Sequence, residues 1–370
     1  MLNVGIVGLP NVGKSSLFNA LTAAGAPSEN YPFCTVEPNV GTVAVPDERL
    51  DRIHGVSESK ERTPTFIHFV DIAGLVEGAS EGEGLGNQFL GQIREVHAIA
   101  HVLRCFEDPD VAHVSGSVDP VRDREVVETE LALADLATVE RRLERIEKKA
   151  RSGEQDARKE LAVLQKTHAV LAEGDPVRSV ELADHEARWI RGLHLLTSKP
   201  VLYVANVGEE DLPGGEEENE HVRALEEAVE AEGGGEEAEI VTVCTKIESE
   251  LAELEPEERK AFLEELGLER SGLERLINAA YRLLGLITFF TTGPKETRAW
   301  TVRSGATAPE AAGQIHTDFQ RGFIRAETIS FDELMEAGSM KAARERGLIR
   351  AEGRDYEVRD GDVILFRFNV

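Results

Sequence analysis

Short apolar segments alternate with amphipathic segments through the first 110 residues, and the same alternation returns after residue 200. Short apolar runs bounded by turn residues are typical of buried strands. Strands that alternate with helices predict an α/β fold, with a largely parallel sheet covered by helices on both faces. The predicted strands are residues 2–7, 41–45, 65–71, 98–105, 200–206 and 240–244.

Between these two blocks the apolar positions repeat at helical steps of three and four residues. One narrow stripe covers residues 136–146 and another covers residues 161–171, and Ser152 and Gly153 lie between them. Two narrow stripes joined by a turn predict an antiparallel coiled-coil hairpin. His168 lies on the second stripe, and we expect it to pack in the seam rather than to bind a ligand.

The last 85 residues change character again, because many short strands and few helices follow one another. This order predicts a small α+β module. Its expected strands are residues 287–292, 300–302, 327–330, 355–358 and 363–368, with one helix after Pro309 and another around residues 331–346. The expected domains are the first part of the α/β domain at 1–120, a helical arm at 121–190, the second part at 191–285 and the C-terminal module at 286–370.

The composition favours a cytoplasmic protein. The chain has 41% apolar residues, and it contains no apolar run of the roughly 18 residues that a membrane span needs. The N-terminus lacks the basic region of a secretory signal. The three cysteines are odd in number and far apart, so we expect neither a disulfide framework nor a cysteine metal site. We expect no membrane partner and a monomer.

Charge is distributed unevenly over the chain, which has a net charge of −28. Residues 209–239 hold fourteen acids and one base, whereas residues 286–370 hold thirteen acids and twelve bases. Basic residues also outnumber acids at 141–151. Two interpretations of this basic cluster remain open: Glu–Arg pairing on a solvated helix face, or a contact surface for RNA. We expect no DNA partner.

The sequence GLPNVGKS at residues 8–15 matches the P-loop pattern, and it lies between a predicted strand and a predicted helix. Gly8 and Gly13 permit a tight loop whose backbone N–H groups converge on phosphate oxygens at the helix N-terminus. Lys14 would bridge the β- and γ-phosphates, and the Ser15 hydroxyl would bind Mg²⁺. The expected phosphate-binding residues are Asn11, Val12, Gly13, Lys14, Ser15 and Ser16.

Two downstream segments are candidates for sensing the γ-phosphate. Asp71 and Gly74 form a D-x-x-G motif at a strand end, where Asp71 would hold a Mg²⁺-bound water and the Gly74 N–H would reach the γ-phosphate. Thr35 is the expected second Mg²⁺ hydroxyl. Leu75 follows the motif at the position where Ras-like enzymes have the glutamine that orients water. Another group must therefore position water, or hydrolysis is slow.

The base-recognition motif departs from that of GTPases, which is Asn-Lys-x-Asp. Here the strand at 200–206 is followed by Val207-Gly208-Glu209, so only Asn206 remains of the motif. Guanine would leave donors unpaired in such a site, which costs about 1–3 kcal/mol per group. The sequence therefore favours ATP over GTP, with Asn206, Val207 and Glu209 near the base. Cys244 and Thr245 would either close over the base or simply end a strand.

These motifs together resemble the YchF/Obg-like ATPases, a branch of the Obg group of P-loop GTPases, over essentially the whole chain. The C-terminal part of the pattern resembles the TGS module, a ubiquitin-like β-grasp domain. The segments that carry the resemblance are residues 8–16, 30–39, 71–77, 113–116, 119–120, 206–209, 305–309, 315–319 and 322–327.

The resemblance implies an ATPase associated with the ribosome or ribosomal RNA, and a P-loop domain interrupted by a helical hairpin and followed by TGS. It also implies that His113 takes over the role of the missing glutamine, although by itself His113 is an ordinary loop histidine. Asn11 matches an asparagine that coordinates K⁺ in potassium-activated P-loop enzymes. Two alternatives remain open: an Obg-like GTPase, and a nucleotide-switched adaptor whose hydrolysis is incidental.

Overall fold

The computed structural model describes residues 2–24, 39–72, 85–213, 218–231 and 239–369. The chain forms two compact units. One comprises Met1–Val43 and His68–Ala280, and the other comprises Ala44–Ile67 and Tyr281–Val370. In the described part of the chain, no helix is both long enough and apolar enough to cross a membrane.

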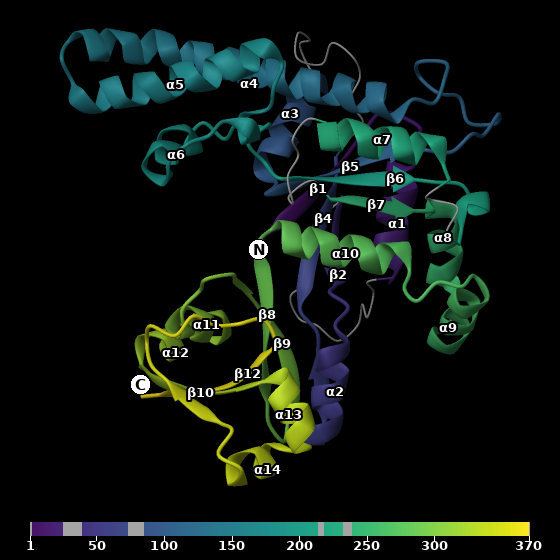
Figure 1. Ribbon diagram of the computed structural model, residues 1–370, viewed down its shortest axis with the longest axis vertical. Helices are drawn as coiled ribbons and strands as arrows, with labels where there is room; N and C mark the ends of the chain where they lie inside the picture. The colour runs from purple at the N-terminus through teal and green to yellow at the C-terminus, as the bar shows by residue number, and fades with distance from the viewer. Residues whose placement is uncertain (1, 25–38, 73–84, 214–217, 232–238, 370) are drawn as a thin grey trace. The chain divides into compact units, whose positions relative to one another are not determined.

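A six-stranded sheet in the order β2-β4-β1-β5-β6-β7 forms the centre of the first unit (Figure 1). β1 pairs in parallel with β4 and β5, and the parallel pairing continues from β5 to β6 and from β6 to β7. Every residue of β5 and β6 is buried, as expected for central strands of a sheet covered on both faces. The predicted α/β fold is therefore confirmed. The bounds are β1 (Asn3–Val7), β2 (Val40–Ala44), β4 (Phe66–Asp71), β5 (Ala98–Arg104), β6 (Val201–Asn206) and β7 (Ile240–Val243).

Helices follow the carboxyl ends of these strands, which is where α/β proteins place their ligand sites. α1 begins seven residues after β1 ends, and α8 begins two residues after β7 ends. α1 packs against α8, while α4 packs against α7 and β5. Besides the hairpin helices, the bounds are α1 (Lys14–Ala24), α3 (Leu85–Glu95), η1 (Val177–Ser179), α6 (Asp184–Arg191), η2 (Glu209–Asp211), α7 (Glu220–Ala231), α8 (Thr245–Glu253), α9 (Pro256–Glu265) and α10 (Gly272–Leu283).

The predicted helical hairpin is formed by α4 (Pro120–Arg151) and α5 (Gln155–Glu173), which lie side by side and project from the sheet in Figure 1. Gly153, with φ 95°, lies in the turn between them. The prediction for His168 is wrong in detail. Thr167 is fully buried in the seam, whereas the His168 side chain is 36% exposed, with Nε2 3.5 Å from Glu140 Oε1. The apolar stripe therefore passes one residue away from His168.

The second unit contains a mixed six-stranded sheet in the order β11-β10-β12-β8-β9-β3. β12 and β8 are parallel neighbours, and each also has an antiparallel partner, β10 and β9 respectively. This arrangement is the predicted α+β, β-grasp fold. The bounds are β3 (Glu61–Thr63), β8 (Leu286–Thr292), β9 (Glu296–Arg303), β10 (Phe323–Ser330), β11 (Arg350–Glu352), β12 (Asp362–Phe368), α2 (Glu48–Ser57), α11 (Ala308–Ile315), α12 (Thr317–Arg321), α13 (Phe331–Ala337) and α14 (Met340–Glu345).

Two expectations for this unit are corrected. Residues 355–358 do not form a strand, because only Glu357 makes an isolated bridge, with Thr307. The helix expected around residues 331–346 is divided into α13 and α14. Gly338 separates them with φ 76°, a left-handed conformation that ends a helix and favours glycine.

The second unit also includes a segment from early in the sequence, which the apolar pattern did not predict. β3 pairs in parallel with β9, and the Ser59 hydroxyl lies 2.8 Å from that of Thr297. Arg49 of α2 pairs with Asp360 at 2.6 Å. The chain between β2 and β4 therefore belongs to the second unit and adds β3 to its sheet.

Candidate nucleotide-binding and hydrolysis site

The loop between β1 and α1 carries the P-loop sequence. Gly8, Asn11 and Gly13 have positive φ angles of 156°, 63° and 99°. A Cβ at Gly8 would lie 2.5 Å from the Val102 carbonyl oxygen, and a Cβ at Gly13 would lie 2.3 Å from Asn206 Nδ2. Both positions therefore require glycine. The loop leads directly into α1, whose first backbone N–H groups lack helical acceptors and so suit an anion.

Lys14 and Asp71 place opposite charges beside this loop. Lys14 is buried, and its Nζ donates a hydrogen bond to the Leu9 carbonyl oxygen at 2.6 Å. Burial lowers the pKa of Lys14 to about 8, while the charge of Asp71 opposes this shift. Burial also raises the pKa of Asp71, and Lys14 counteracts that change. The Lys14 ammonium and the Asp71 carboxylate thus interact electrostatically where β1 and β4 end.

The remaining residues expected around the phosphates are only partly described. Ser15 and Ser16 are exposed in the first turn of α1. Thr35, Gly74 and Leu75 lie outside the described residues, so their roles stay predictions. Within the described ranges, no three His, Cys, Asp or Glu side chains cluster in a way that could hold a metal ion.

Asn206 connects the P-loop to the loop that follows β7. It lies at the end of β6 and is buried, with Nδ2 donating to the Val12 carbonyl oxygen at 2.9 Å. Its Oδ1 accepts a hydrogen bond from the Thr245 backbone N–H at 3.1 Å. The side chain expected to contact the base therefore also positions both loops around the candidate site.

Glu209 and Lys246 bring together the two loops expected to surround the base. Lys246 Nζ lies 2.7 Å from Glu209 Oε1, and both side chains are exposed. Val207 and Cys244, which precede these two residues in the same loops, are buried, and the Val207 N–H donates to the Val243 carbonyl oxygen. The lysine that follows Thr245 was visible in the sequence, but its pairing with Glu209 was not predicted.

The loop after β6 is held by two residues that the sequence patterns missed. Asp211 Oδ2 accepts hydrogen bonds from the Gly208 N–H and from Asn219 Nδ2, at 2.9 and 3.0 Å. Asn219 Nδ2 also donates to the Cys105 carbonyl oxygen at 2.9 Å. Both residues belong to the acidic segment at 209–239, whose charge density concealed their structural role.

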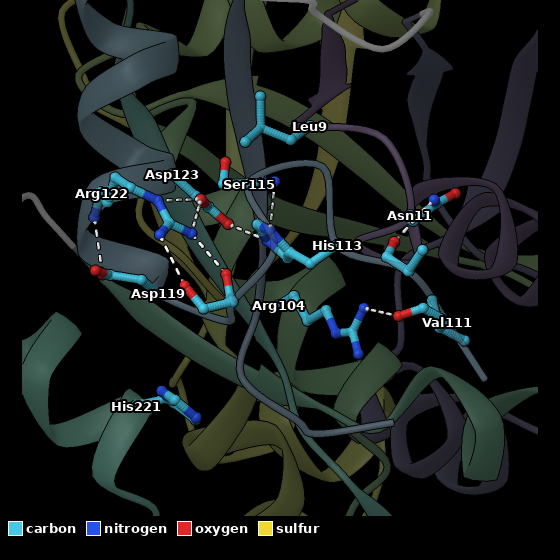
Figure 2. A network of polar contacts seen from close by, with 12 residues as sticks. Leu9, Asn11, Arg104, Val111, His113, Ser115, Asp119, Arg122, Asp123 and His221 are labelled. Atoms are coloured by element: carbon cyan, nitrogen blue, oxygen red, sulfur yellow. Dashed lines mark hydrogen bonds and ion pairs between the residues drawn. The ribbon is translucent and has the colours of Figure 1, made fainter. Parts of the chain in front are cut away.

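His113 makes hydrogen bonds through both ring nitrogens, as Figure 2 shows. Nε2 lies 2.7 Å from Asp123 Oδ2, and Nδ1 accepts a hydrogen bond from the Ser115 backbone N–H at 3.1 Å. The side chains of His113 and Asp123 are only 4% and 1% exposed. The resemblance identified His113, but it did not identify Asp123 as its partner.

The loop that carries His113 is attached to the P-loop and to β5. Asn11 Nδ2 donates to the Ala112 carbonyl oxygen at 3.1 Å (Figure 2). The guanidinium of Arg104, which is buried at the end of β5, donates to three carbonyl oxygens at 2.8–3.1 Å; these belong to Phe106, Asp108 and Val111. The only sign of this attachment in the sequence was an arginine at the end of an otherwise apolar strand.

Comparison with known proteins covers the entire chain. The family model described as 50S ribosome-binding GTPase matches residues 3–132, and the YchF-GTPase_C model, described as a protein of unknown function, matches residues 286–369. The ribosome-binding ATPase YchF of Bacillus subtilis is 54% identical over 100% of both chains, and that of Escherichia coli O157:H7 is 54% identical over 99% of both. The solved structure of the Schizosaccharomyces pombe YchF GTPase is 36% identical, with a TM-score of 0.89 over 99% of this chain and 97% of that one.

Proposed function

The chain belongs to the YchF family, and on that premise we propose that it hydrolyses ATP to ADP and phosphate and binds the ribosome. The bacterial relatives are named ribosome-binding ATPases. The observation that carries the hydrolase proposal is the P-loop, in which glycine-dependent backbone geometry places the buried Lys14 ammonium at the start of α1. This combination stabilises the negative charge of transferred phosphate.

The residues around the P-loop fit a Mg²⁺ ion. Hydroxyl and carboxylate oxygens are the donors that Mg²⁺ prefers, and Ser15 and Asp71 supply one of each near Lys14. We propose that Ser15 and Thr35 hold the ion directly and that Asp71 holds one of its waters. When bound, Mg²⁺ neutralises charge on the β- and γ-phosphates.

A K⁺ ion beside the phosphates is a further proposal for Asn11. The side-chain Nδ2 is directed to the Ala112 carbonyl oxygen. The amide carbonyl oxygen on the opposite branch is therefore the group that would contact K⁺. ATP turnover is expected to be faster in potassium than in sodium buffer, and Asn11→Ala is expected to remove the difference.

We propose that Gly74 and His113 act at the γ-phosphate. The Gly74 backbone N–H would contact the γ-phosphate, and His113 would position the attacking water, because Leu75 has no polar group for that task. An His113→Ala protein is expected to bind ATP normally and to hydrolyse it more slowly. Unchanged turnover would remove His113 from the mechanism.

The preference for ATP over GTP is proposed from the loop after β6. Guanine recognition needs a carboxylate that accepts from N1–H and the exocyclic amine, whereas the Glu209 carboxylate is already paired with Lys246. We place the base beside Asn206, Val207 and Glu209, with Cys244 and Thr245 at its other edge. Each unpaired guanine donor would cost about 1–3 kcal/mol.

The specificity proposal predicts the effect of restoring the guanine motif. The double variant Val207→Lys, Glu209→Asp creates Asn-Lys-Gly-Asp, and it is expected to increase GTP affinity relative to ATP at least tenfold, which is about 1.4 kcal/mol. Competition titration with labelled ATP measures this ratio, and the neighbouring Glu210→Asp is the matched control. A wild-type protein that binds GTP tenfold more tightly than ATP would instead identify an Obg-like GTPase.

A nucleotide-switched adaptor is the second candidate function. The observation that favours it is that both His113 ring nitrogens are occupied by protein groups, an arrangement suited to slow hydrolysis. Ribosome binding that depends on nucleotide and survives His113→Ala would support the adaptor. We further propose that the protein acts as a cytoplasmic monomer that contacts ribosomal RNA.

A further inference from the structure

The hydrogen bonds of His113 define its proton position. Because Nδ1 accepts from the Ser115 N–H, the neutral ring carries its proton on Nε2 and donates it to Asp123. Neither ring nitrogen is then available to orient a water molecule. A role for His113 in hydrolysis therefore requires that the ring exchanges these partners for others.

Asp123 is the fixed member of the pair. It lies in the first turn of α4 and is fully buried. Its second oxygen, Oδ1, accepts hydrogen bonds from Arg122 Nε and Nη2 at 3.3 and 3.1 Å. Arg122 is held in turn by the Ser117 carbonyl oxygen at 2.7 Å and by the N-cap residue Asp119, whose Oδ1 accepts from the Arg122 N–H. The carboxylate is thus buried on a helix and bound by Arg122, so the exposed loop that carries His113 is the side with freedom to move.

The loop around His113 is divided into a clamped part and a lightly held part. Arg104 binds carbonyl oxygens only as far as Val111. From residue 112 to residue 117 every residue except His113 is exposed, and Val114 is 53% exposed. Gly116 has φ 81° and no atom within 4 Å of a Cβ built on it. Between its contacts with Asn11 at Ala112 and with Arg122 at Ser117, this short exposed segment has room to move without disturbing the core.

The P-loop contacts the same segment one residue before the histidine. Asn11, in a left-handed conformation with φ 63°, donates to the Ala112 carbonyl oxygen (Figure 2). A nucleotide that changes the conformation of the P-loop therefore acts on the backbone adjacent to His113. The His113 ring itself is bound to the buried Asp123 carboxylate of α4.

We propose that Asp123 is a positioning residue that holds His113 away from the reacting phosphates, and that breaking the His113–Asp123 hydrogen bond precedes rapid hydrolysis. This inference rests on the proposed function, since it assigns a regulatory step to the same site. When one conformation is competent and minor, weakening the other raises the competent fraction in proportion. Weakening the hold on His113 therefore accelerates hydrolysis.

The test is an Asp123→Asn protein, which keeps the shape of the carboxylate but removes its charge and so weakens the hydrogen bond to Nε2–H. Single-turnover ATP hydrolysis is expected to accelerate about three- to tenfold with unchanged ATP affinity. The double variant with His113→Ala is expected to lose the gain. Asp184→Asn, in the first turn of α6 and exposed, is the matched control and leaves turnover unchanged.

A second variant and a spectroscopic readout keep the proposal testable if Asp123→Asn folds poorly. Ser115→Pro removes the backbone N–H that donates to His113 Nδ1, and it is also expected to accelerate single-turnover hydrolysis. The ¹⁵N shifts of His113 are expected to show the Nε2–H tautomer in the wild type and a mixture of tautomers in either variant. Slower turnover in both variants, or acceleration that persists without His113, would overturn the proposal. Absence of ATP hydrolysis even in the wild type would instead overturn the proposed function.

Discussion

At the scale of single residues, the P-loop contains the buried cation of Lys14, whose charge is costly. Lys14 has a pKa lowered to about 8 by burial, with Asp71 opposing the shift. On the proposed role of Lys14, bound phosphates would stabilise the protonated ammonium, so part of the free energy of nucleotide binding would come from relieving this unfavourable burial. The protonation state of Lys14 therefore links nucleotide affinity to pH.

The lowered pKa of Lys14 predicts that ATP affinity decreases with increasing pH. Above pH 8 the free protein loses the Lys14 proton and must take it up again to bind ATP, so affinity falls as pH rises. Between about pH 7 and pH 9 the affinity is expected to fall about tenfold, with proton uptake detectable by calorimetry in two buffers. Lys14→Arg keeps its charge over this range and should show no such fall. An equal fall in both proteins would place the titrating group elsewhere.

Individual residues were predictable from the sequence only where a motif fixes their geometry. Gly8, Gly13 and Lys14 follow from the P-loop pattern, and the structure gives the steric reason for the two glycines. Asp123 and Asn219 belong to no motif, because their roles come from hydrogen bonds to backbone or side chains that the fold brings near. Resemblance identified His113, but only its hydrogen-bond partners in the fold indicate which ring nitrogen carries the proton.

At the scale of elements, apolar periodicity predicted the parallel strands and the hairpin because each of them buries a regular set of apolar positions, complete in β5 and β6 and confined to one stripe in α4 and α5. It missed β3, whose three residues Glu61–Thr63 have no apolar alternation, since pairing with β9 forms it. It placed a strand at 355–358, where only an isolated bridge occurs. Short elements stabilised by distant partners thus escape local patterns.

The basic cluster of the hairpin at 141–151 is a candidate contact surface for the ribosome. Of the basic cluster at 141–151, Arg151 pairs with Glu147 and Arg142 pairs with Glu160 of α5, whereas Arg145, Lys148 and Lys149 are exposed. Replacing these last three with Glu is expected to weaken ribosome binding at least tenfold and to reduce its salt dependence, because phosphate contacts release counterions. Sedimentation with ribosomes at several KCl concentrations measures the effect.

The control for this charge reversal is Lys260→Glu, which changes an exposed lysine of α9. It should leave ribosome binding nearly unchanged. If the triple variant binds like the wild type at every salt concentration, the basic cluster is a solvated face and the contact lies elsewhere.

At the scale of the whole molecule, the chain passes between its two units three times, because residues 44–67 belong to the second unit and add β3 to its sheet. The second unit is therefore built from two separate stretches of the sequence. The net charge of −28 is concentrated away from the C-terminal module, where acids and bases nearly balance. If the protein contacts RNA as proposed, this charge distribution favours the basic cluster of the hairpin and that module as the contact.

The most direct test of the account is calorimetric titration of the wild-type and Lys14→Ala proteins with ATP in Mg²⁺ buffer, followed by phosphate release. We expect the wild type to bind and hydrolyse ATP and to lose turnover when Mg²⁺ is chelated. We expect Lys14→Ala, although folded, to lose both activities by at least a hundredfold, or about 2.7 kcal/mol. No nucleotide uptake by the wild type, or equal uptake and turnover by both proteins, would contradict it.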